Sequence, residues 1–126
     1  MPKFLSLIFL LFLCTSILAQ EKPVLIIFSG SDWCNNCLKL DKAVLSNQDV
    51  QALINEKFTL IEADFPRDDS HMEKHEVKRN ETLADIYNAQ GSFPAIVITV
   101  EGKEIARKDG YNYETPASFI QWLEKY

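Results

Sequence analysis

The sequence predicts an α/β domain with the element order β-α-β-α-β-β-α and a four-stranded mixed sheet flanked by helices. Three observations lead to this prediction. The near-continuous apolar run 24–29 is typical of a parallel strand covered on both faces. Residues 38–45 carry apolar side chains at helical spacing. Near the C-terminus, two strand-like runs are separated only by Glu101 and Gly102, which indicates an antiparallel hairpin.

The first half of the domain is predicted to form one βαβ unit. After the strand 24–29, the residues 30–32 supply a polar turn, and the helix 38–45 follows. Asn47 has the side chain of a helix cap and opens a second helical piece. The run 58–64 then reads as the second strand, which lies parallel to the first through a right-handed crossover.

The second half begins with a charged segment, 67–80, which we expect to be an exposed excursion. It leads into a helix over 81–88, which Gly91 ends as a left-handed cap. The remaining predicted elements are the strands 95–100 and 103–108 and a last helix that Thr115 caps and Pro116 opens.

Residues 1–19 have the pattern of a secretory signal peptide. Lys3 supplies the positive charge, an apolar stretch follows it, and Ala19 is a small residue at the expected cleavage point. Cleavage leaves a single domain, residues 20–126, in the periplasm or secreted. The alternatives are an uncleaved membrane anchor, for which the apolar stretch is short, and lipoprotein processing at Cys14.

Charge and cysteine content narrow the function. Without residues 1–19 the chain keeps 12 of its 13 Lys and Arg and all 18 Asp and Glu, a net charge of −6. This balance argues against nucleic acid or an anionic membrane surface as a partner, so membrane contact is expected only through an uncleaved leader. Two cysteines remain, Cys34 and Cys37, and the loop between them is too small to stabilise the fold. Their role is therefore predicted to be chemical.

Cys34 and Cys37 lie where the first strand passes into the first helix. A Cys-x-x-Cys pair at such a junction is a setting for thiol–disulfide exchange, and the start of the helix favours the thiolate of Cys34. The alternatives are an inert pair or half of a zinc site. A zinc site needs about four ligands, and the other thiols and imidazoles are few: Cys14, His71 and His75. We expect no metal and no cofactor.

Trp33 directly before the cysteine pair, and the dipeptide Phe93-Pro94 before the third strand, complete a recognisable pattern. With them the chain, from about residue 23 to 126, resembles the thioredoxin-like superfamily, and most of all exported single-domain members with a Trp-Cys-Asn-Asn-Cys motif. A charged insertion that starts at Asp64 strengthens the likeness. The resemblance implies a thioredoxin-like fold.

The resemblance also implies roles for the site residues. Cys34, as the more exposed sulfur, attacks a substrate disulfide, and Cys37 resolves the mixed disulfide. Pro94 is expected to be cis, with Phe93 lining the substrate groove, although a trans proline opening a strand is the alternative. Trp33 is expected to be a half-exposed contact surface, or alternatively a core aromatic. Asp32 either adds local charge or caps the following helix.

One feature of the family is absent. Many thioredoxins bury an aspartate in the first strand as a proton relay, whereas the matching positions here, Ile27 or Phe28, are apolar. Glu62, at the end of the second strand, is a candidate relay, with Lys39 as its charge partner. The alternative is that both are ordinary surface residues.

The leading function is an exported thiol–disulfide oxidoreductase acting on protein disulfides. We favour a reductase, because Asn35 and Asn36 between the sulfurs provide no cation to stabilise a thiolate. The alternatives are a binding or chaperone-like module without redox turnover, and a dedicated thiol reductant for metal- or haem-protein maturation. The expected partners are protein disulfides or dithiols and an upstream redox protein, the protein itself being a monomer. The segment 67–79 is a candidate partner surface.

Overall fold

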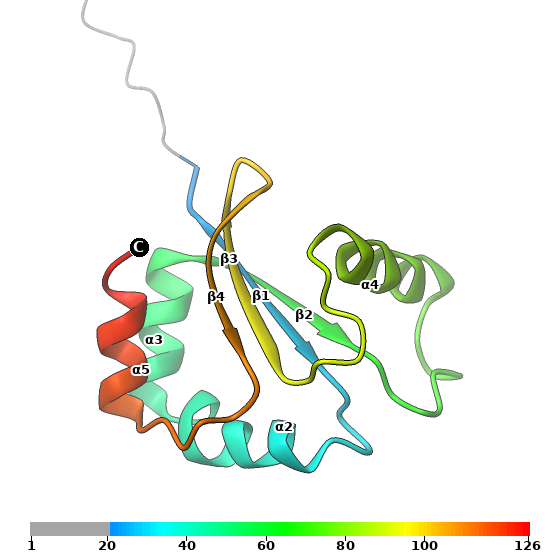
Figure 1. The fold of residues 1–126 in the computed structure, drawn as a ribbon, viewed down its shortest axis with the longest axis horizontal. Helices are drawn as coiled ribbons and strands as arrows, with labels where there is room; N and C mark the ends of the chain where they lie inside the picture. Colours follow the sequence, from blue (N-terminus) through cyan, green and yellow to red (C-terminus); the bar gives the residue numbers. More distant parts are fainter. Residues whose placement is uncertain (1–20) are drawn as a thin grey trace, which may run out of the picture.

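The computed structural model describes residues 21–126, so the predicted signal peptide and Cys14 lie outside the described residues. One four-stranded sheet forms the centre of the domain, in the order β2-β1-β3-β4. β1 runs parallel to β2, and the other neighbouring pairs are antiparallel, which confirms the predicted fold class (Figure 1). The strands are β1 (Val24–Ser29), β2 (Thr59–Asp64), β3 (Ala95–Val100) and β4 (Lys103–Asp109).

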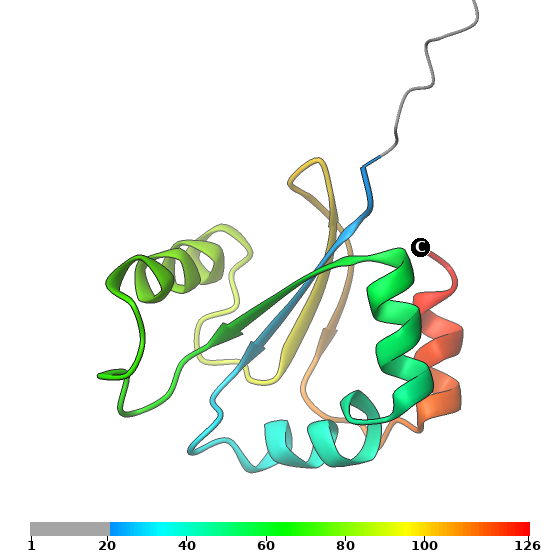
Figure 2. The same ribbon diagram turned by 180° about the vertical axis from the view of Figure 1, so that it is seen from behind.

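Helices cover both faces of this sheet. Figures 1 and 2 show α3 and α5 together on one side of the sheet and α4 on the other, with α2 across the end of β1. No helix within residues 21–126 is long and apolar enough to cross a membrane. The helical elements are α2 (Asn35–Leu40), the π-helical turn η1 (Asp41–Leu45), α3 (Gln48–Lys57), α4 (Lys74–Ile86) and α5 (Pro116–Leu123).

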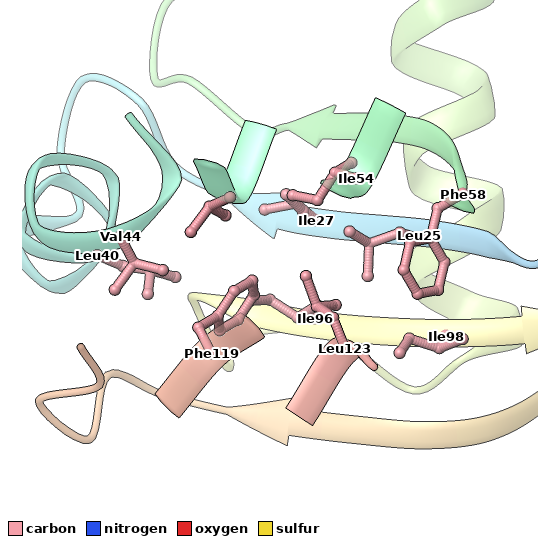
Figure 3. Packing of buried hydrophobic residues seen from close by; sticks show 11 residues of the cluster. Leu25, Ile27, Leu40, Val44, Ile54, Phe58, Ile96, Ile98, Phe119 and Leu123 are labelled. Atoms are coloured by element: carbon pink, nitrogen blue, oxygen red, sulfur yellow. The ribbon is translucent and has the colours of Figure 1, made fainter. Parts of the chain in front are cut away.

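β1 is buried on both faces, as its continuous apolar run predicted. Leu25 and Ile27 point into the larger core cluster, shared with α3 and α5, which Figure 3 shows from close by. Ile26 and Phe28 point the other way, into a smaller cluster that includes Ala84 of α4. The strand therefore stands between two apolar layers and holds the residues that follow it in a fixed position.

The first helix begins earlier than predicted and changes its winding. α2 starts at Asn35, and the chain continues as η1, where the Ser46 amide donates to the Asp41 carbonyl at 2.8 Å. This wider turn brings Val44 into the core. The next helix begins as predicted: the Asn47 side chain accepts hydrogen bonds from two amides at the start of α3.

The prediction for α4 was wrong at both ends. The helix occupies Lys74–Ile86 rather than 81–88, so part of the expected excursion is helical. It escaped detection because its buried face is narrow and most of its side chains are charged or polar. At its end Asn88 takes the left-handed conformation, with φ 51°, whereas Gly91 reaches φ 76° only later, in the loop.

α4 is tied to the sheet through a buried amide. Asn80 is 1% exposed, and its Nδ2 donates to the Asp64 carbonyl at 3.1 Å. Its Oδ1 accepts from Nε and Nη2 of Arg79 at 3.1 and 2.9 Å. The triplet Asn80-Glu81-Thr82 has the form of a glycosylation sequon, but the Asn80 side chain is buried in this fold and leaves no room for a glycan. This network fixes the end of β2.

The hairpin and the last helix follow the sequence closely. Glu101 and Gly102 both have positive φ, 52° and 77°, as a tight two-residue hairpin turn requires. Thr115 caps α5 reciprocally with Ser118, and Pro116 occupies its first turn. These local signals needed no long-range information to be read correctly.

Candidate active site

Cys34 and Cys37 form a disulfide at the start of α2, with their Cα atoms 5.2 Å apart. Cys34 is the cap residue of this helix, and its sulfur accepts a hydrogen bond from the Cys37 amide at 3.2 Å. The Cys34 amide itself donates to the Gly30 carbonyl at 2.9 Å, which closes the turn after β1. Strand, turn and helix together place the pair just beyond the C-terminal end of β1, an inner strand of the sheet.

The two cysteines are buried to a similar degree. As whole residues Cys34 is 5% exposed and Cys37 is 7% exposed in this disulfide form, and the greater exposure of the Cys34 sulfur stays a prediction. The turn to Gly30 folds Cys34 back over the end of β1, and the bond to Cys37 holds both side chains at a similar depth.

The peptide bond between Phe93 and Pro94 is cis, which confirms that prediction. Pro94 is fully buried, and its carbonyl accepts a hydrogen bond from the Gly110 amide at 2.7 Å. It lines the same cavity as Cys37. The proline therefore joins the start of β3 to the end of β4 next to the cysteine pair.

Three aromatic rings lie together beside the disulfide. The ring of Phe93 lies 5.7 Å from that of Trp33 and stacks at 5.2 Å on that of Phe65. Trp33 also donates from Nε1 to the Phe65 carbonyl at 2.6 Å. Trp33 is 38% exposed, which confirms the expected half-exposed position and excludes the alternative of a core aromatic. Phe65 was not predicted as a site residue, because its only signal in the sequence is that of an apolar residue at the start of a charged segment.

Gly30 makes room for Trp33. A Cβ atom at this position would overlap the indole ring, so the close approach of ring and backbone requires glycine.

Hydrogen bonds join the turn before Cys34 to the segment after β2. The Asp32 carboxylate accepts from the amide of Arg67, at 2.9 and 3.1 Å, and from that of Asp68, at 3.4 Å. The Asp64 carboxylate accepts from the amide and the hydroxyl of Ser31, at 2.9 and 2.6 Å. The interpretation of Asp32 as the cap of the following helix is therefore wrong, because its oxygens face the other segment.

A cavity of about 280 Å³ lies behind the disulfide. In the parallel pairing of β1 and β2, Glu62 stands opposite Ile27, so both side chains face this side of the sheet. The Glu62 carboxylate thus borders the cavity from the strand next to the one that carries the buried aspartate in many thioredoxins, but Glu62 itself is exposed. The polar and reactive residues lining the cavity are Cys37, Ser29, Ser31, Asp41, Glu62 and Asp64.

Lys39 does not join Glu62 at the cavity. It is exposed in the last turn of α2 and is not among the residues that line the cavity. Within residues 21–126 there is no ion pair between Lys39 and Glu62. The same part of the chain holds no group of three side chains suited to a metal ion, and His71 and His75 are exposed.

The chain is similar to known proteins over most of its length. The family model described as a thioredoxin-like domain matches residues 15–126. A disulfide bond reductase of Chlamydia pneumoniae, DsbH, is 33% identical over 70% of this chain and 52% of its own. A solved structure of a DsbH oxidoreductase has a TM-score of 0.76 at 28% identity, over 83% of this chain and 72% of the other.

A second solved structure, a disulphide isomerase from Xylella fastidiosa Temecula1, has a TM-score of 0.59 at 26% identity, over 83% of this chain and 78% of the other. The chain spans about half or less of the length of the curated relatives it matches. The family model matches most of the chain, and the fold and the cysteine pair agree with that match. The chain therefore belongs to the thioredoxin-like domain family.

Proposed function

We propose that this protein is an exported thiol–disulfide oxidoreductase that works as a reductase on protein disulfides. The observation that carries the proposal is the Cys34–Cys37 disulfide at the start of α2, beside the cis bond before Pro94. Similarity to a protein named as a disulfide bond reductase supports it. Trp33 and Phe93 form the surface against which the substrate chain lies, and the buried Pro94 holds the backbone of Phe93 in place behind it.

The proposed cycle moves two electrons and two protons to the substrate. The thiolate of Cys34 attacks one sulfur of a substrate disulfide, and the other substrate sulfur leaves and takes a proton. The thiolate of Cys37 then attacks the Cys34 sulfur of the mixed disulfide and releases the second substrate thiol. The protein is left with the Cys34–Cys37 disulfide, which an upstream dithiol protein reduces again.

The charges around the cavity favour the reducing direction. Asp41, Glu62 and Asp64 line the cavity next to Cys37, and no lysine or arginine of the described residues does. Like charge disfavours a neighbouring thiolate. Strong oxidants of this class stabilise their reduced form, so an acidic surrounding that does the opposite makes a more reducing couple.

The experiment that tests this proposal is a measurement of the reduction potential. The domain 20–126 is equilibrated with glutathione or dithiothreitol buffers of defined ratio, and the thiol content is determined by alkylation and mass spectrometry. We expect a potential of about −230 mV or lower. A potential between about −120 and −180 mV would show an oxidant or isomerase instead. A pair that does not cycle would favour the binding-module alternative.

We further propose that Glu62 accepts the proton of the Cys37 thiol when the mixed disulfide is resolved. Replacing Glu62 by glutamine keeps the shape of the side chain but removes the base, so resolution should slow about tenfold near neutral pH. Stopped-flow measurement of substrate release across a pH series checks this. Glu56→Gln, at an exposed glutamate of α3, is the matched control. An equal rate in the two variants would remove Glu62 from the mechanism.

A further inference from the structure

The three rings beside the disulfide form a surface that is open to a partner. We call Trp33, Phe65 and Phe93 the aromatic rim. None of the three is fully buried, and they contact one another in series through Phe93. The rim comes from three separate segments: the turn before Cys34, the residues after β2 and the loop before β3. It borders the cysteine pair because Trp33 directly precedes Cys34.

The aromatic rim is held in position before any partner arrives. Phe65 contributes its carbonyl to the indole of Trp33, and the next residues of its segment are bound through their amides by the Asp32 carboxylate. Gly30 leaves the space that the indole fills. A contact surface with this many internal hydrogen bonds loses little conformational entropy on binding, so most of the contact energy remains available for affinity.

The surroundings of the aromatic rim are acidic. Arg67 is the one basic residue of the segment 64–69, and within the described residues neither it nor any of the nearby carboxylates takes part in an ion pair. Hydrogen bonds from Ser70 hold the pKa of the Asp68 carboxyl below its ordinary value, so it stays charged. The carboxylates of this border are Asp32, Asp64, Asp68 and Asp69.

We infer that the aromatic rim selects substrate chains that carry an aromatic or large aliphatic side chain next to the reacting cysteine, with a lysine or arginine close by. The apolar side chain stacks on Phe65 and Phe93, and the cation faces the carboxylates that border them. This inference rests on the proposed function and adds the class of substrate to it. The candidate partner surface predicted from the sequence was the whole segment 67–79. The inference restricts this surface to the first residues of that segment together with the aromatic rim.

Four cyclic peptides test this inference. All four contain the same disulfide. The residue directly before the first cysteine is phenylalanine or alanine, and the residue one position earlier is lysine or glutamate. The rate of peptide reduction by the reduced domain is followed under single-turnover conditions. We expect phenylalanine to raise the second-order rate constant of peptide reduction roughly tenfold over alanine. Lysine should raise it several-fold over glutamate at low salt, with a smaller difference at about 0.5 M salt because added ions screen the carboxylates.

A variant assigns the selectivity to the aromatic rim. Phe65→Ala removes one ring, and we expect the preference for phenylalanine over alanine to fall to about twofold. Ile86→Ala is the matched control, since it removes an apolar side chain that is 63% exposed on α4. This control should keep the wild-type preference. The comparison uses a ratio of two substrates, so a general loss of activity does not imitate it.

The outcomes separate the two proposals. If the wild-type domain reduces all four peptides at equal rates, the inference about the aromatic rim is overturned while the reductase proposal stands. The same holds if Phe65→Ala and Ile86→Ala lose the preference equally. If the domain reduces none of the peptides and its cysteine pair does not cycle in dithiothreitol, the proposed function itself fails. The wild-type comparison requires no variant, so it remains decisive if Phe65→Ala does not fold.

Discussion

Replacing Cys34 by serine is expected to lower the rate of disulfide exchange by at least about a thousandfold, because a hydroxyl cannot take the place of the attacking thiolate. Cys34 is the cap residue of α2 and directly follows Trp33, the most exposed residue of the aromatic rim. Reduction of insulin or of a cyclic peptide disulfide, followed optically or by mass spectrometry, measures the loss.

Cys37→Ser is the informative companion of this variant. Cys34 can still attack, but nothing resolves the mixed disulfide, so a covalent adduct with the substrate should accumulate and be visible on a non-reducing gel. Serine at either position is close in size to cysteine, and the fold is expected to tolerate both. If the two variants lose activity without any trapped adduct, the assignment of attacking and resolving thiols is wrong.

The second large effect is on stability. Phe119 of α5 is completely buried in the larger core cluster, to which Leu40 of α2 and Val44 of η1 also belong (Figure 3). Replacing it by alanine should lower the free energy of unfolding by about 3–5 kcal/mol, from lost burial and from the cavity left behind. Small domains have only about 5–15 kcal/mol in total, so this variant would be close to unfolding.

Urea denaturation followed by circular dichroism measures this change. Gln121→Ala, on the exposed side of the same helix, is the control and should change the stability by no more than about 0.5 kcal/mol. Similar midpoints for the two variants would mean that α5 does not close the core as the structure indicates.

The sequence was sufficient for features that depend on neighbouring residues. The apolar runs located β1 and β3, and the caps at Asn47 and Thr115 located the starts of α3 and α5. The cis bond before Pro94 was also predicted, although through the family resemblance rather than from local chemistry. In each case the residue types are suited to only a few backbone conformations.

The sequence was insufficient where distant segments meet. Asp32 accepts hydrogen bonds from residues 35 and 36 positions further along the chain, and no local pattern distinguishes this from capping the next helix. Phe65 became a site residue only when the ring of Phe93 was placed against it. Glu62 was proposed on its position alone, and the register of β1 with β2 was needed to place it opposite Ile27.

The segments around the cysteine pair are largely separate from the larger core cluster, and this separation affects which residues can change. The helix that Cys34 caps contributes to the larger cluster only through Leu40, and the following turn η1 contributes Val44. None of the residues 31–37 or 65–69 belongs to the buried members of that cluster. Apart from the two cysteines, side chains in these two segments can therefore be changed without altering the larger cluster, so client preference can change while that part of the core stays the same.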